Sequence, residues 1–227
     1  MVYIVDRSLK FLRGAVLSFG PEAIKRRIWD KEYRSEKWKF AYNTSGDCVY
    51  GHLERYARGG SILDMGCGSG NTSTEMAESA YTCYVGVDIA EAALEKARRR
   101  SAECGREAKN SYACSDFFSY EPTGQFDVIL FRESMYHVPM GKIKPLLEKL
   151  APHLKTDGVF IVRLFTQTLD TGERKERPNT MLRIMESEFD LLEKRQYEVA
   201  GRPVVLVFRP VAKGSRREQT EPSHQAV

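Results

Sequence analysis

The most constraining feature of the sequence is a strand-like run at residues 61–65 that leads directly into a glycine-rich turn at residues 66–70. Glycine is needed where the backbone turns with positive φ or approaches a ligand with no Cβ in the way. A turn of this kind at the carboxyl end of a parallel strand lies at the ligand crevice of an open α/β sheet. The sequence therefore predicts a binding site around this turn.

Short β-rich runs alternate with helical patterns through the middle of the chain. Between the runs, residues 91–100 and 142–150 carry apolar side chains at helical spacing. This alternation predicts an α/β fold with a Rossmann-like, doubly wound sheet whose parallel strands are joined by right-handed crossovers. The expected parallel strands are 61–65, 81–88, 111–115, 126–131 and 158–165.

The regular alternation of strands and helices ends after residue 165. A polar stretch and a helix are expected first, and then two β-like runs, 189–199 and 203–211, separated by Ala200-Gly201-Arg202. This pattern predicts a hairpin that adds an antiparallel edge to the sheet. The last segment, 212–227, lacks apolar periodicity and is expected to be a disordered tail.

A carboxylate at the end of the second expected strand indicates which ligand the turn binds. Asp88 is placed to accept hydrogen bonds from both hydroxyls of a ribose. The glycine spacing, D-x-G-x-G-x-G from Asp64, differs from the G-x-G-x-x-G dinucleotide fingerprint because position 71 is Asn. The loop also has no Lys-Ser or Lys-Thr pair for a triphosphate. Together these features predict a site for an adenosine-type nucleoside.

With these motifs, residues 47–210 resemble the class I S-adenosylmethionine-dependent methyltransferases, in particular the small-molecule type (methyltransferase types 11, 12 and 25) with LDxGCGxG in the first motif. The family's sheet has seven strands with the last antiparallel, which agrees with the predicted hairpin. The resemblance implies a methyltransferase domain at 47–211 that uses S-adenosyl-L-methionine. It also implies in-line SN2 transfer of a methyl group to an oxygen or nitrogen of a small-molecule acceptor.

Matching positions carry the family's cofactor contacts onto this chain. Asp64 and the loop would cradle the methionine portion, while Asp88, with Ile89 behind it, would hold the ribose and flank the adenine. The cofactor-binding residues that the resemblance implies are Asp64, Gly66, Cys67, Gly68, Gly70, Asp88, Ile89, Asp116, Phe117, Arg132 and Glu133.

The third and fourth strands are expected to end at further contacts. Asp116 matches the family position where an acid meets the adenine amino group, and Phe117 would pack on the ring. Arg132 and Glu133 would lie beside the cofactor and face the acceptor. The run ESMYHV at 133–138 is similar to the family's E-x-L-x-H-V.

Simpler roles remain open for two of these residues. Asp116 is also suited to cap the turn after the third strand. Cys67 lies between two glycines, where a small side chain fits, and no paired base is near it in the sequence. We therefore expect Cys67 to have no nucleophilic role.

His137 is the candidate catalytic residue. Methyl transfer is an attack on an already activated sulfonium methyl, so alignment and desolvation supply much of the acceleration. A base is required only if a hydroxyl or an acidic carbon must lose a proton, and a histidine just past the fourth strand is suited to that task. A packing role for His137 is an alternative that the sequence supports equally well. His52, by contrast, is expected on an exposed helix face.

The segment 1–46 is expected to form an N-terminal helical lid over cofactor and acceptor, as in similar enzymes. Its first 40 residues hold ten Lys and Arg against five Asp and Glu, and these cations would attract an anionic acceptor. A solvated face with buried aromatics is one alternative, and weak attachment of residues 11–19 to a membrane surface is another. The residues expected to contact the acceptor are Trp29, Tyr33, Trp38 and Tyr136.

Composition and charge exclude several classes of protein. The net charge of +4 is too mild for a dedicated nucleic-acid binder, and no Asn/Asp-Pro-Pro-Tyr-type motif is present. No run approaches the roughly 18 apolar residues that stable membrane insertion needs. Five cysteines without a C-x-x-C pair suggest neither a disulfide framework nor a metal site. A cytoplasmic protein is expected.

Two other functions remain as alternatives. A non-catalytic, methyltransferase-like partner subunit would keep the fold as an interaction surface, but a damaged cofactor loop would then be expected, and this loop is intact. An NAD-dependent oxidoreductase is disfavoured by the glycine spacing and by the lack of a Tyr-x-x-x-Lys pair in a suitable catalytic helix.

Overall fold

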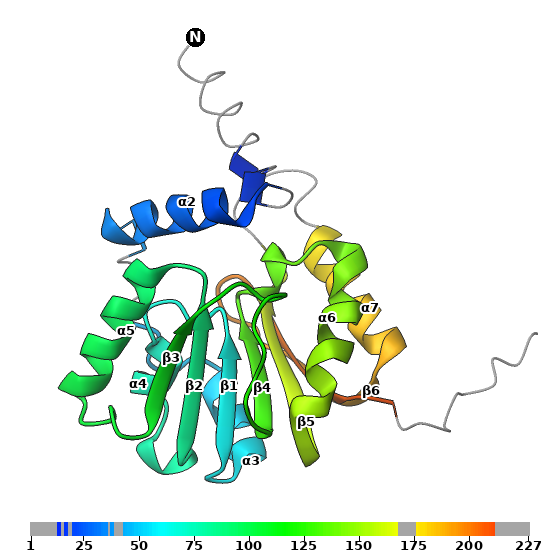
Figure 1. The fold of residues 1–227 in the computed structure, drawn as a ribbon. Helices are drawn as coiled ribbons and strands as arrows, with labels where there is room; N and C mark the ends of the chain where they lie inside the picture. Colours follow the sequence, from blue (N-terminus) through cyan, green and yellow to red (C-terminus); the bar gives the residue numbers. More distant parts are fainter. Residues whose placement is uncertain are drawn as a thin grey trace, which may run out of the picture.

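A seven-stranded sheet with the order β3-β2-β1-β4-β5-β7-β6 forms the centre of the molecule (Figure 1). The strands are β1 (Ser61–Met65), β2 (Cys83–Asp88), β3 (Asn110–Cys114), β4 (Phe126–Arg132), β5 (Leu154–Phe165), β6 (Asp190–Gln196) and β7 (Pro203–Arg209). The structure is a computed structural model that describes residues 13, 14, 16, 17, 20–35, 37, 38, 43–167 and 176–211.

Strands β1 to β5 run parallel, and β7 inserts between β5 and β6 with antiparallel pairing on both sides. The two halves of the sheet wind outward from the junction of β1 and β4, so the strand order reverses there. Such a switch point leaves a crevice at the carboxyl ends of the strands. The predicted Rossmann-like sheet with its antiparallel C-terminal hairpin is therefore confirmed.

Helices cover both faces of the sheet. Helices α6 and α7 pack on one face, and α3 packs on the other. Helix α5 runs along β3 and also contacts α2 (Figure 1). The helices are α2 (Glu22–Arg34), α3 (Val49–Ala57), α4 (Asn71–Glu75), α5 (Glu91–Glu103), α6 (Ile143–Leu150) and α7 (Glu176–Glu188).

Helix α6 shows how the apolar pattern builds these layers. Its four large aliphatic side chains follow the i, i+3, i+4, i+7 spacing, so all of them face the sheet. Burying each one stabilises the fold by about 1.5–3 kcal/mol relative to an exposed side chain. The four buried residues are Ile143, Leu146, Leu147 and Leu150.

Strand β5 begins earlier than the sequence predicts. We expected it at residue 158, but it starts at Leu154 and carries three exposed polar residues before its buried half. The pairing register with β4 shifts between Phe126 and Val128. At Gly158 a Cβ would lie only 2.7 Å from the carbonyl oxygen of Phe126. Glycine therefore lets the strand continue through a polar segment that has the composition of a turn.

Helix α2 lies over the carboxyl edge of the sheet, above β2 and β3 (Figure 1). Asp30 of α2 accepts a hydrogen bond from the backbone N–H of Ala92 (2.9 Å), at the start of α5. Lys96 of α5 donates to the carbonyl oxygen of Tyr33 (2.7 Å). These contacts fix α2 in the position expected of a lid.

Some of the expectations fall on parts of the chain that the structure does not describe. The tail predicted at 212–227 lies outside the described residues, and so do Phe11 and Phe19 at the ends of the segment considered for membrane attachment. The domain limits at 46 and 211 remain predictions. Within the part of the chain that is described, no helix is both long and apolar enough to cross a membrane.

Candidate active site

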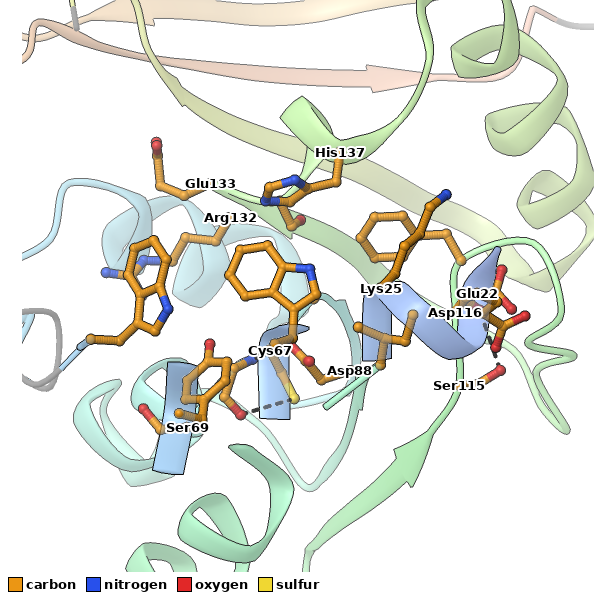
Figure 2. Close-up of a pocket in the computed structure, with 18 of the residues that line it drawn as sticks. Glu22, Lys25, Cys67, Ser69, Asp88, Ser115, Asp116, Arg132, Glu133 and His137 are labelled. Carbon is orange, nitrogen blue, oxygen red and sulfur yellow. Dashed lines mark hydrogen bonds between the residues drawn. The ribbon is translucent and has the colours of Figure 1, made fainter. Parts of the chain in front are cut away.

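A cavity of about 540 Å³ lies between α2 and the carboxyl ends of β1, β2 and β4, bounded also by the loop after β3 (Figure 2). Its size is typical of a site for a small molecule or cofactor. Thirteen of the residues predicted for the site form its wall: Trp29, Tyr33, Trp38, Gly66, Cys67, Gly68, Asp88, Ile89, Asp116, Phe117, Arg132, Glu133 and His137.

The glycine loop gives the cavity a floor made of backbone. Gly66 and Gly68 have φ angles of 84° and 54°, in the left-handed region that favours glycine. A Cβ at Gly68 would lie 2.7 Å from the hydroxyl of Tyr33, and one at Gly66 would collide with Ser134. Tyr33 of α2 and Ser134, which follows β4, can approach the loop this closely because Gly66 and Gly68 have no side chains.

Two predicted cofactor residues, Asp64 and Gly70, lie behind the loop and do not line the cavity. Asp64 is buried and accepts a hydrogen bond from the Tyr84 hydroxyl at 2.6 Å. A Cβ at Gly70 would lie 2.9 Å from that of Ala97, so Gly70 allows close packing against α5. Asp64 and Gly70 therefore support the conformation of the loop and do not border the cavity.

Asp88 links the loop to the end of β2. One of its carboxylate oxygens accepts a hydrogen bond from the N–H of Gly68 and the other from the N–H of Ala90, each at 2.9 Å. Burial raises the pKa of Asp88 to about 6 in spite of these bonds. Each oxygen keeps a lone pair, so the carboxylate can still accept hydroxyl donors from the cavity.

Asp116 combines the two roles considered for it. Its Oδ1 accepts from the backbone N–H groups of Phe118 (2.7 Å) and Ser119 (3.2 Å), which is a turn cap. Its Oδ2 is buried without a hydrogen-bond partner in the described part of the chain. Burial alone would raise the pKa of Asp116, but hydrogen bonds from Ser119 and Phe118 hold it below its usual value. An ionised, unpartnered oxygen is suited to accept an amino group.

Glu22 of α2 lies beside Asp116 on the cavity wall (Figure 2). Its pKa is raised, first by burial and then by the neighbouring carboxyl of Asp116. Phe117 also lines the cavity and meets Phe131 edge-on, with ring centroids 6.0 Å apart. This end of the cavity therefore offers acidic acceptors next to an aromatic surface.

A buried network of four charges supports the opposite wall. Arg132 donates two hydrogen bonds to Asp47, at 3.1 and 2.8 Å. Arg163 lies 3.4 Å from the same Asp47 oxygen and binds Glu133 at 2.5 Å. Glu133 has a φ of 56°, a conformation that costs a non-glycine residue about 1–3 kcal/mol and is found mainly at functional sites.

Asp47 and Arg163 were not predicted from the sequence. A weak signal for Asp47 existed, because it precedes a helical stripe and accepts a hydrogen bond from the N–H of Val49 as helix caps do (3.0 Å). Nothing in the sequence pairs it with Arg132, which is 85 positions further along the chain.

His137 lies on the cavity wall beside the lid. Its imidazole meets the indole of Trp29 edge-on, and its ring nitrogens have no hydrogen-bond partner among the described residues. Burial, followed by the positive charges of Arg13, Arg177 and Lys25, lowers the pKa of His137 to about 4. The imidazole is therefore neutral at pH 7, and it is a weaker base than an unperturbed histidine.

The lid's aromatic residues are held by one buried carboxylate. Glu32 accepts two hydrogen bonds from Arg13 (both 2.8 Å), one from Lys37 (2.7 Å) and one from the indole N–H of Trp38 (3.2 Å). Trp38 packs on Trp29 with ring centroids 5.6 Å apart. Trp29 and Trp38 thus pack on each other and also line the cavity, and the lid role of this segment remains a prediction.

Two other predictions differ from the structure. Tyr136 does not line the cavity, because its hydroxyl donates to the carbonyl oxygen of Phe165 at 2.9 Å. The prediction that His52 is exposed is wrong, since only 1% of it is accessible. The C-terminal hairpin covers it, and its Nε2 lies 2.7 Å from the hydroxyl of Tyr197. Lining residues that the analysis missed are Glu22, Lys25, Ser69, Asn71, Ser115, Phe118, Ser119 and Ser134.

Comparison with known families identifies the central part of the chain. Residues 62–158 match the family described as "Methyltransferase domain". This stretch contains the glycine loop, Asp88, Asp116 and His137, and it spans β1 to the first residues of β5. The predicted resemblance to the class I methyltransferases is confirmed.

Curated relatives match over part of their length. A ubiquinone biosynthesis O-methyltransferase of Neisseria meningitidis is 32% identical over 140 residues, which cover 59% of this chain and 55% of that protein. The protein of the same name from Aromatoleum aromaticum is 36% identical over 81 residues, which cover 36% of this chain and 34% of the relative. The chain thus spans about a third to just over half of these relatives.

Solved structures share the fold over most of the chain. N-methyltransferase NodS from Bradyrhizobium japonicum, in complex with S-adenosyl-L-homocysteine, superposes with a TM-score of 0.64 at 16% identity, covering 82% of this chain and 98% of its own. Magnesium protoporphyrin IX methyltransferase from Synechocystis, also with S-adenosylhomocysteine bound, gives 0.64 at 17% identity, covering 83% and 100%. At these identities the likeness establishes the fold.

Proposed function

We propose that this protein is an S-adenosylmethionine-dependent methyltransferase that acts on an oxygen or nitrogen of a small molecule. The observation that carries the proposal is Asp88, a half-buried carboxylate at the end of β2 that binds the glycine loop and borders the cavity. The matched methyltransferase domain and the two neighbours with S-adenosylhomocysteine bound support it.

The cavity fits the cofactor on its own chemistry. The glycine loop leaves space that any Cβ would fill, and Asp88 keeps acceptor capacity for the ribose hydroxyls. The unpartnered Oδ2 of Asp116 suits the adenine amino group, with Phe117 beside it for the ring. Arg132 and Glu133 border the remaining end, near the methionine portion.

When bound, S-adenosylmethionine supplies an activated methyl group on a sulfonium centre. The chain's residues align the acceptor and exclude water, because α2 covers the cavity with Trp29, Tyr33 and Trp38. His137 accepts a proton from the acceptor where the acceptor atom is a hydroxyl oxygen. Its unpartnered, neutral ring on the cavity wall supports this role over simple packing.

Methyl transfer itself tests the proposal. The purified protein is incubated with S-adenosylmethionine and a panel of small hydroxylic and amine acceptors, and formation of S-adenosylhomocysteine is followed. We expect acceptor-dependent product with the native chain and none with Asp88→Ala. Cofactor binding without turnover of any acceptor would favour a non-catalytic partner subunit.

A further inference from the structure

The charges around His137 are unbalanced. Lys25 of the lid lines the cavity, and its ammonium group forms no hydrogen bond or ion pair within the described part of the chain. Arg177 of α7 donates only to the carbonyl oxygens of Tyr136 (2.9 Å) and Val138 (3.1 Å), on either side of His137, and has no carboxylate partner among the described residues. Two cations from separate elements thus flank one neutral imidazole.

The other cations near this end of the cavity are matched, whereas Glu22 and Asp116 are two neighbouring carboxyl groups. Arg13 is held by both oxygens of Glu32, and Glu133 is paired with Arg163. Glu22, one helical turn before Lys25, faces Asp116 and is bound by Arg26 at 3.4 Å. Lys25 is therefore the cavity-lining cation left available to a ligand.

We propose that the methyl acceptor is a small organic anion with a flat, apolar body, whose carboxylate binds the ammonium group of Lys25 while its ring packs against Trp29. This inference rests on the proposed methyltransferase function and names the acceptor class for the same cavity. Figure 2 shows Lys25 on α2 and His137 on the short helical turn after β4, both lining the same cavity.

Electrostatics favours an anion over an amine at this position. Lys25 and Arg177 are unpaired cations that act on His137, Lys25 from the cavity wall and Arg177 from outside the lining, and a sulfonium donor would bring another positive charge into the cavity. An ammonium-bearing acceptor beside His137 would add a fourth positive charge in a partly desolvated site, where charges interact more strongly than in water. A carboxylate would instead pair with Lys25 and anchor the molecule with its other end toward His137.

A matched set of three probes tests the inference. 2-Naphthoate, 2-naphthamide and 2-naphthylmethylamine share one ring system and are anionic, neutral and cationic, respectively. Each is titrated into the protein with and without saturating S-adenosylhomocysteine. We expect naphthoate to bind about 10- to 100-fold more tightly than the amide, as for a hydrogen bond between charged groups, and the amine to bind most weakly.

Two lysine variants on one helix locate the effect. Lys25→Met should abolish the preference for naphthoate, and Lys25→Arg should keep most of it. Lys31→Met is the matched control, because Lys31 is an exposed residue of α2 outside the cavity. It should leave all three affinities unchanged.

Each result decides the question. Equal or tighter binding of the amide or amine, undiminished preference in Lys25→Met, or no binding of any probe at millimolar concentration would overturn the anionic-acceptor proposal. S-adenosylhomocysteine affinity, measured in the same variants, reports separately on the methyltransferase proposal. If that compound fails to bind, the titrations without it still test the role of Lys25.

Discussion

The indole of Trp29 meets the imidazole of His137 edge-on, with ring centroids 5.0 Å apart and planes inclined at 79°. Trp29 belongs to the lid and His137 to the turn after β4, so this contact joins two parts of the chain that are far apart in sequence. His137 is exposed on the cavity wall, and desolvation by the surrounding protein, to which the Trp29 contact contributes, is the main cause of its lowered pKa. The position of the lid therefore affects the pKa of His137.

The first prediction concerns His137 in turnover. Replacing it with Ala should reduce the rate with a hydroxylic acceptor by about 10²- to 10⁴-fold, the usual contribution of a positioned base. Affinity for S-adenosylhomocysteine should change little. Because a base must be unprotonated and the pKa of His137 is about 4, the native rate at saturating S-adenosylmethionine should persist as pH falls through 6.5 and decline only near pH 4. Unchanged turnover in the variant would leave His137 a packing residue.

The second prediction concerns stability in acid. The pKa of His137 is about 4 in the folded chain and 6.5 when unperturbed. Between these pH values the unfolded chain binds a proton at this residue and the folded chain does not, so acid favours unfolding. His137 is exposed on the cavity wall, so solvent screening reduces the effect, and the free energy of unfolding should fall by about 1 kcal/mol between pH 6.5 and pH 4 through this group. Urea unfolding at pH 7 and pH 4.5 should show a smaller loss in His137→Asn than in the native chain. An identical loss in both proteins would exclude a lowered pKa for His137.

The third prediction concerns Asp88 and cofactor affinity. Asp88→Asn should weaken binding of S-adenosylhomocysteine by about 10- to 100-fold, because a charged acceptor of hydrogen bonds is lost. Native affinity should also decline as pH falls through about 6, where Asp88 takes up a proton, and this dependence should vanish in the variant. Asp127→Asn is the control, since Asp127 binds Ser61 and Lys155 outside the cavity. Native affinity in Asp88→Asn would remove the ribose assignment.

The fourth prediction concerns the buried charges behind the site. Asp47 is 5% exposed and pairs with both Arg132 and Arg163. Asp47→Ala leaves two buried cations without this partner, so we expect the free energy of unfolding to fall by about 3–5 kcal/mol. Lys155→Ala, which breaks the more exposed pair with Asp127, should cost less than about 1 kcal/mol. Similar denaturant midpoints for the two variants would show that the Asp47 network contributes little.

Local sequence signals predicted the elements that depend on local chemistry. The glycines from Gly66 to Gly70 have φ requirements that other residues meet poorly, and Asp88 follows an apolar strand at the expected distance. Alternating strands and helices then restrict the topology to a few arrangements, which is why a mostly parallel sheet with an antiparallel hairpin could be anticipated. Most of the predicted cofactor wall follows from these constraints.

Tertiary contacts between distant segments had no comparable signal. The pairing of Asp47 with Arg132, the position of Lys25 beside His137 and the burial of His52 under Tyr197 all depend on how separate elements pack. The helical pattern around His52 left its face ambiguous, because the C-terminal hairpin that covers it lies more than a hundred residues away.

The most direct test of the central claim is calorimetric titration of the purified protein with S-adenosylmethionine, S-adenosylhomocysteine and NAD in parallel. We predict saturable, one-site binding of the two adenosyl-sulfur compounds, no heat from NAD, and loss of the signal in Asp88→Ala. Binding of NAD in preference to them, or no binding of either sulfur compound, would contradict the assignment of the cavity to S-adenosylmethionine.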